Sequence, residues 1–124
     1  MQKVFLVDDS PLVRERIAQM VEALPQLRLV GQAAGVPEAI SGILAARPDL
    51  VLLDLSLENG SGFDVLSAVH RREPGIAFYM LSNFASEPYR RHAERLGARG
   101  FFDKSTDLER LRSTLMGETT CQQS

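Results

Sequence analysis

The sequence predicts an α/β fold with a parallel sheet that helices cover on both sides. Five short apolar runs, typical of strands, begin near residues 3, 28, 49, 77 and 100. Helical patterns fill every gap between these runs, and this alternation is typical of βαβ units. The runs 50–53 and 77–81 are continuously apolar, as in strands that are buried on both faces. With 124 residues, the chain fits one domain with a substantial core.

The first two helices are marked by their ends. Ser10 suits the cap position and Pro11 the first turn, and apolar residues then recur at helical spacing until Pro25. The second helix is expected at about 37–46. It ends before Pro48, because the residue that precedes a proline disfavours helical geometry.

The remaining helices are expected at about 63–72, from just after Ser86 to Gly97, and from about 106 to 116. Thr106 and Glu109 have the spacing of a capping box at the start of the last helix. The residues after it are polar and aperiodic. We therefore expect a domain over 1–116 and a flexible tail over 117–124.

Composition argues against several functional classes. The formal net charge of -2 provides no general attraction to nucleic acid or anionic lipid. The single cysteine, Cys121, cannot form a disulfide framework, which is consistent with a reducing compartment. No apolar run approaches the length of a membrane span, and the N-terminal run is too short for a signal peptide. We therefore expect a cytoplasmic protein that binds neither nucleic acid nor membrane directly.

Polar side chains follow four of the apolar runs. Asp8 and Asp9 come after the first run, Asp54 after the third, Ser82 after the fourth and Lys104 shortly after the fifth. Each of these residues has an ordinary interpretation on its own, as a helix cap, a turn residue or a surface residue. In an open parallel sheet, however, ligands bind beyond the carboxyl ends of the strands. We therefore expect the five residues to form one site.

The chemistry of this set favours a divalent cation and a phosphoryl group. Two carboxylates about 4 Å apart repel each other by about 4 kcal/mol at an effective dielectric constant near 20, and a hard cation relieves that cost. Mg²⁺ favours one or two carboxylates with water and phosphate oxygens. Asp54 could then act as a nucleophile that forms an aspartyl phosphate. Ser82 could donate to a phosphoryl oxygen, and Lys104 could pair with another.

These residues, in this order and spacing, resemble the response-regulator receiver domains of two-component signalling. The resemblance covers residues 3 to about 116, and it includes Gly62, eight positions after Asp54, and the segment 97–104. It implies a flavodoxin-like, doubly wound, five-stranded parallel sheet of (βα)5 topology with strand order 2-1-3-4-5.

The resemblance also assigns roles. It implies that Asp54 accepts the phosphoryl group and that the domain catalyses its own phosphorylation and slow dephosphorylation. Asp8, Asp9, Asp54 and the backbone carbonyl of Ser56 would hold Mg²⁺, with Asp8 acting through water. Lys104 would contact the phosphoryl group, while Ser82 and Phe101 would act as switch residues.

The implied partners are a sensor histidine kinase or a phosphotransfer protein, and a downstream protein target. The signalling surface would consist of the helix 86–97, the strand that begins near 100 and the helix 106–116. A homodimer through the same surface is compatible with the resemblance, which does not decide the oligomeric state. We expect no DNA-binding output domain in a chain of this length.

Four positions differ from the common family pattern. Ser105 replaces a proline whose preceding peptide is often cis, and Glu58 stands where proline is common. Ser82 replaces the commoner threonine, and Phe101 lacks the hydroxyl of the frequent tyrosine.

Two other functions remain open from the residues alone. A phosphohydrolase of the haloacid-dehalogenase type would carry a second aspartate two positions after its nucleophile, whereas Ser10 and Pro11 occupy those positions here. A flavodoxin-like cofactor module would have a phosphate loop rich in Ser, Thr and Gly after the first strand. The acidic pair at 8–9 would repel a cofactor phosphate instead.

Overall fold

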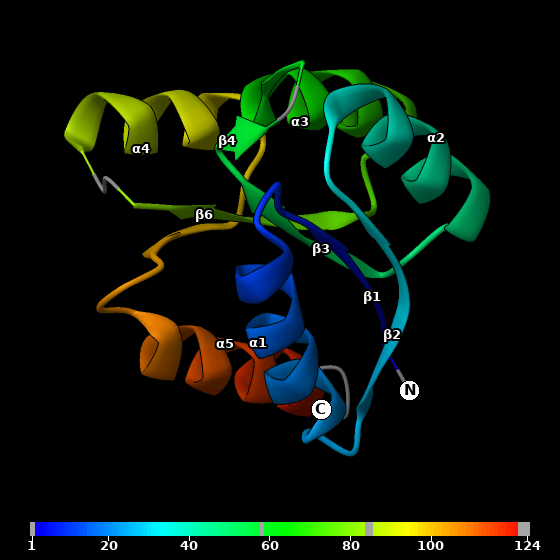
Figure 1. The fold of residues 1–124 in the computed structure, drawn as a ribbon, viewed down its shortest axis with the longest axis vertical. Coiled ribbons are helices and arrows are strands. Elements are labelled where there is room, and N and C mark those ends of the chain that lie inside the picture. Colours follow the sequence, from blue (N-terminus) through cyan, green and yellow to red (C-terminus); the bar gives the residue numbers. More distant parts are fainter. Residues whose placement is uncertain (1, 58, 84–85, 122–124) are drawn as a thin grey trace.

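The computed structural model describes residues 2–57, 59–83 and 86–121, with the side chains of the last helix described to residue 117. Strands and helices alternate along this part of the chain (Figure 1). The elements, in order, are β1 (Gln2–Val7), α1 (Pro11–Glu22), β2 (Leu27–Ala33), α2 (Val36–Ala46), β3 (Leu50–Asp54), β4 (Ser56–Leu57), β5 (Gly60–Ser61), α3 (Gly62–Arg72), β6 (Ala77–Ser82), α4 (Glu87–Arg95), β7 (Gly100–Asp103) and α5 (Leu108–Cys121).

The main sheet in the described residues has five strands in the order β2-β1-β3-β6-β7, and every pair is parallel. Counted along the chain, this is the expected order 2-1-3-4-5, so the predicted doubly wound fold is confirmed. From β1 the chain adds β2 on one side, and it then adds β3, β6 and β7 on the other side. Folds of this kind bind ligands at the switch point between β1 and β3, beyond the carboxyl ends of the strands.

Helices cover both faces of the sheet. In Figure 1, α1 and α5 lie on one side, and α2, α3 and α4 lie on the other. The strands supply alternate residues to two cores: Leu6 and Leu52 pack with α1 and α5, whereas Val7 and Leu53 pack with the other three helices. Burial on both faces explains why the central strands are continuously apolar.

The structure differs from the expected elements in three places. A two-residue antiparallel ladder, β4 with β5, forms in the loop after β3. Helix α5 continues to Cys121, so the expected end of helical structure at residue 116 is wrong. It also begins at Leu108, so Thr106 does not cap it. The capping box lies instead at the start of α3, where Ser61 and Asp64 exchange hydrogen bonds.

No helix in the described ranges combines the length and the apolar character that are needed to cross a bilayer.

Candidate phosphoryl-acceptor site

The carboxyl ends of the strands bring the predicted site residues to one edge of the sheet. Asp8 and Asp9 lie in the turn between β1 and α1. Asp54 and Ser82 are the last residues of β3 and β6, and Lys104 directly follows β7.

Three carboxylates form an acidic cluster, defined here as Asp8, Asp9 and Asp54. One carboxylate oxygen from each residue can be chosen so that all three oxygens lie within 4.8 Å of one another. Asp8 and Asp54 are buried, with 0% and 3% of their surface exposed, whereas Asp9 faces solvent. The cluster therefore has two anchored carboxylates and one accessible carboxylate, and hard oxygen ligands of this kind suit Mg²⁺.

Lys104 bridges the two buried carboxylates. Its Nζ lies 2.6 Å from Asp8 Oδ2 and 2.9 Å from Asp54 Oδ2, and only 9% of its side chain is exposed. One ammonium among three carboxylates leaves a formal charge of minus two at the cluster when all three are ionised. A divalent cation would neutralise this charge.

The surroundings shift the pKa of both partners in the Asp54–Lys104 pair. Burial raises the pKa of Asp54 from 3.8 to about 6, and the charge of Asp8 contributes, although the hydrogen bond from Lys104 opposes the shift. Burial lowers the pKa of Lys104, but the hydrogen bonds and charges of Asp8 and Asp54 outweigh it and leave that pKa above its usual value. Lys104 therefore carries its charge at neutral pH.

Backbone amides orient the buried carboxylates. The Ser10 N–H donates to Asp8 Oδ1 at 2.9 Å, and the Ser56 N–H donates a longer bond of 3.4 Å to Asp54 Oδ1. The backbone of Ser56, whose carbonyl was predicted as a metal ligand, therefore lies beside the cluster.

Gly62 allows the start of α3 to pack directly against the end of β3. Its N–H donates to the Leu55 carbonyl at 2.7 Å, and a Cβ at this position would overlap the carbonyl oxygen of Asp54. Such a Cβ would also lie 3.1 Å from Met80 Cε. The close approach explains why a glycine stands eight positions after the candidate nucleophile.

Ser82 lies in the same region but is placed by its backbone. It is 4% exposed, and its carbonyl accepts a hydrogen bond from the Lys104 N–H at 2.8 Å. With Ser56 and Tyr89 it lines a groove of about 480 Å³ between the β4–β5 ladder and α4. Ser82 therefore lies at the same edge of the sheet as Asp54, at the end of the neighbouring strand.

Phe101, the second predicted switch residue, is 3% exposed and packs in the core shared with α4. Its carbonyl accepts hydrogen bonds from Arg90 of α4 at 3.5 Å and from Arg110 of α5 at 3.0 Å. The Arg90 guanidinium also lies 5.5 Å from the centre of the Phe101 ring. Arg90 is therefore only partly exposed, whereas its neighbour Arg91 faces solvent.

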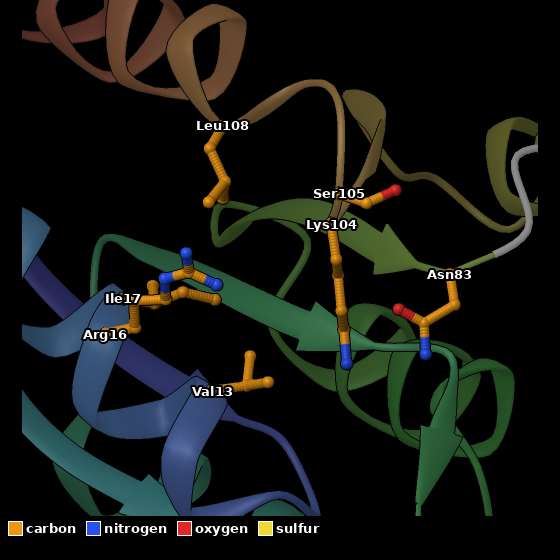
Figure 2. A pocket seen from close by; sticks show the side chains of 7 residues that line it. All are labelled: Val13, Arg16, Ile17, Asn83, Lys104, Ser105 and Leu108. Atoms are coloured by element: carbon orange, nitrogen blue, oxygen red, sulfur yellow. The ribbon is translucent and has the colours of Figure 1, made fainter.

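A second, smaller pocket opens between α1 and the loop after β7, with a volume of about 160 Å³. Figure 2 shows its lining: the apolar side chains of Val13, Ile17 and Leu108 lie on one side, and the long Lys104 side chain extends past them. Arg16 of α1 lies beside the same space. The acidic cluster is thus flanked by a partly apolar surface on the α1 side.

Three of the four departures from the family pattern lie within the described residues, and Ser105 is the third of them, after Ser82 and Phe101. The described residues contain no cis peptide bond, so the Lys104–Ser105 peptide is trans. The Ser105 N–H and hydroxyl both donate to Asp103 Oδ1, at 2.8 and 2.6 Å, and these bonds hold the loop in place of a proline. They also lower the pKa of Asp103. Glu58 lies outside the described residues.

Comparison with known proteins identifies the family and the fold of the chain. The family model for the response regulator receiver domain matches residues 4–116. The chain belongs to the response-regulator receiver family. The receiver is 36% identical over 104 residues to the DNA-binding transcriptional activator DevR/DosR of Mycobacterium tuberculosis, covering 84% of this chain and 48% of that protein. It is 31% identical over 122 residues to the oxygen regulatory protein NreC of Staphylococcus epidermidis, covering 94% of this chain and 56% of that protein.

The receiver thus spans about half the length of these curated relatives. Among solved structures, it is similar to a LuxR-family response regulator from Aurantimonas, with a TM-score of 0.89 and 26% identity, over 94% of this chain and 84% of that chain. It is also similar to the receiver domain of the NarL response regulator from Mycobacterium tuberculosis, with a TM-score of 0.86 and 26% identity, over 94% of each chain.

Proposed function

We propose that this receiver accepts a phosphoryl group on Asp54 from a phosphohistidine and signals through the surface formed by α4, β7 and α5. The observation that supports this most directly is the environment of Asp54. A buried carboxylate ends a central strand, with a lysine 2.9 Å away and two more carboxylates within metal-binding distance. A merely structural ion pair would not need the two additional carboxylates.

In the proposed reaction, a carboxylate oxygen of Asp54 attacks the phosphorus atom and forms an O–P bond. The P–N bond of the phosphohistidine breaks, and its electron pair leaves with the imidazole. Lys104 provides a fixed positive charge beside the transferred oxygens, and such positioning and charge stabilisation account for most of the catalysis of phosphoryl transfer. Loss of the phosphoryl group to water would return Asp54 to its carboxylate form.

The residues present fit a Mg²⁺ ion. Asp8, Asp9 and Asp54 would hold it together with the carbonyl of Ser56, and the formal charge of the cluster matches a divalent cation. When bound, Mg²⁺ neutralises charge on the phosphoryl oxygens during transfer.

The proposed signal depends on charge added at the sheet edge. An aspartyl phosphate adds negative charge and acceptor oxygens, and we propose that the Ser82 hydroxyl moves towards them. Phe101 packs in the core beneath α4, so a movement of the β6–α4 region would change the space available to its ring. The surface of α4, β7 and α5 would then change its fit to a partner.

The proposed partners are a sensor histidine kinase or a phosphotransfer protein as donor, and a downstream protein target. A second copy of the receiver could also bind through the α4–β7–α5 surface. We place the protein in the cytoplasm, where a histidine kinase presents its phosphohistidine. Control of transcription, the role named for the relative from Mycobacterium tuberculosis, would require a DNA-binding partner or segment in addition to the receiver.

Acetyl phosphate with Mg²⁺ tests the proposed acceptor. Intact-mass spectrometry should show one added phosphoryl group in the wild type and none in Asp54→Ala, while Asp49→Ala, an exposed aspartate near the other end of β3, should label normally. Labelling of Asp54→Ala would end the assignment. Multiple turnover of a simple phosphomonoester would favour the phosphohydrolase instead, and a bound flavin in the purified protein would favour a cofactor module.

A further inference from the structure

Asp8 is held at four points, and one of them is a side chain from α1. Its N–H donates to the Ala33 carbonyl of β2 at 3.0 Å, and its Oδ1 accepts the Ser10 N–H at 2.9 Å. Its Oδ2 pairs with Lys104 at 2.6 Å. The fourth point is its backbone carbonyl, which accepts a 2.6 Å hydrogen bond from Nη1 of Arg14.

The hydrogen bond from Arg14 to the Asp8 carbonyl also restrains the position of Asp9. The Asp8 carbonyl and the Asp9 N–H belong to one planar peptide unit, so orienting that carbonyl also sets where the Cα of Asp9 lies. The Asp9 carboxylate is exposed, and in the part of the chain that the structure describes it accepts no hydrogen bond. The position of Asp9 in the acidic cluster therefore depends on its backbone.

We propose that Arg14 is a positioning residue for the divalent-cation site and that it acts by fixing the Asp8–Asp9 peptide. The inference rests on the proposed function to the extent that a cation binds at the acidic cluster. Arg14 would not touch the ion, because its guanidinium is occupied at the carbonyl. In metal sites, groups that orient the ligands commonly change metal affinity by about 10- to 100-fold.

A purely electrostatic role for Arg14 predicts the opposite effect. A guanidinium beside the cluster repels an incoming cation, so removing its charge should strengthen Mg²⁺ binding. A positioning role predicts that removal weakens binding, because Asp9 is no longer held in place. The direction of the change therefore distinguishes the two roles.

Calorimetric titration with Mg²⁺ tests the proposal. In Arg14→Met the aliphatic stem is kept and the donor is lost, and we expect the Kd for Mg²⁺ to rise about tenfold. Arg14→Lys keeps the charge and one donor nitrogen, so its Kd should rise less. Arg16→Met is the matched control: Arg16 lies on the same helix, is exposed, and its side chain makes no hydrogen bond within the described residues. Its Kd should stay unchanged or fall.

Hydrogen exchange of the metal-free protein gives an independent measurement. The amide of Ser10, which donates to Asp8 Oδ1, should exchange faster in Arg14→Met than in the wild type, and Arg16→Met should match the wild type. Unchanged or tighter Mg²⁺ binding in Arg14→Met would overturn the proposal, and so would unchanged exchange of the Ser10 amide. If Arg14→Met does not fold, Arg14→Lys decides in its place, with weaker binding supporting the proposal and equal binding opposing it. If the wild type itself binds no Mg²⁺, the proposed metal site fails, whereas the exchange rates still decide whether Arg14 orders the turn.

Discussion

An ionised carboxylate at position 54 is costly in the metal-free protein, so Asp54→Asn should stabilise it at neutral pH. Burial raises the pKa of Asp54 from 3.8 to about 6 in the folded protein. Because the folded-state pKa lies above the unfolded value, folding is favoured by protonation of this group. That contribution is fully present below pH 3.8 and is lost as the pH rises to about 6. Asparagine keeps nearly the same shape without the charge.

The size of the effect follows from the pKa shift. Each pKa unit corresponds to about 1.4 kcal/mol, so a shift of about two units costs about 3 kcal/mol at pH 7.5. At pH 4 the same shift costs less than about 1 kcal/mol, because Asp54 is then mostly protonated in the folded protein. We take about 3 kcal/mol as a ceiling and expect a gain of about 1–3 kcal/mol from Asp54→Asn at pH 7.5.

Urea unfolding in EDTA at pH 7.5 and at pH 4 measures this gain. Asp9→Asn is the control, because solvent screens that exposed carboxylate and its removal should gain less than about 1 kcal/mol. Mg²⁺ at a hundredfold excess over its Kd should stabilise the wild type by about 2.7 kcal/mol, and Asp54→Asn by much less. No gain at pH 7.5, or a gain of equal size at pH 4, would refute the argument that buried charge destabilises the site.

Two further substitutions test the packing and the ion pairs of the site. Lys104→Ala leaves Asp8 and Asp54 buried without their cation, so the free energy of unfolding in EDTA should fall by about 3 kcal/mol, and saturating Mg²⁺ should restore most of it. A deficit that Mg²⁺ does not reduce would contradict this account. Gly62→Ala places a Cβ against the Asp54 carbonyl, so stability should fall by about 1–3 kcal/mol, and the Kd for Mg²⁺ should rise as Asp54 is displaced. If Gly62→Ala were as stable in urea as the wild type, α3 would be able to move away from β3 at no cost.

The site residues at the strand ends were predictable because the end of a buried strand has a signal in the sequence. A continuous apolar run followed by a polar residue predicts a buried strand that ends at the sheet edge, and Asp54 and Ser82 fit that pattern. Periodicity alone could not give the order of the strands. That order came from the resemblance to receivers, because pairing between strands depends on contacts that are distant in sequence.

The missed features depend on contacts that leave no local pattern. Arg14 and Arg90 bind backbone carbonyls, and any residue type can offer a carbonyl, so nothing in the sequence distinguishes them from solvated arginines. The β4–β5 ladder has two residues on each side, too few for an alternating pattern. Its turn does leave a signal in the sequence, because Asn59 and Gly60 are residue types that tolerate positive φ, and they adopt φ values of 62° and 141°. Helix α5 continues past its last buried leucine, Leu115, because extending a formed helix costs less than starting one.

The two arginines on the Phe101 carbonyl have a consequence for aggregation. β7 is the last strand of the sheet, and an open border strand is a template on which another chain can add a strand of its own. Guanidinium groups from α4 and α5 occupy a carbonyl of β7 that such an incoming strand would need. Two copies of this protein should therefore meet through helices rather than merge into one continuous sheet.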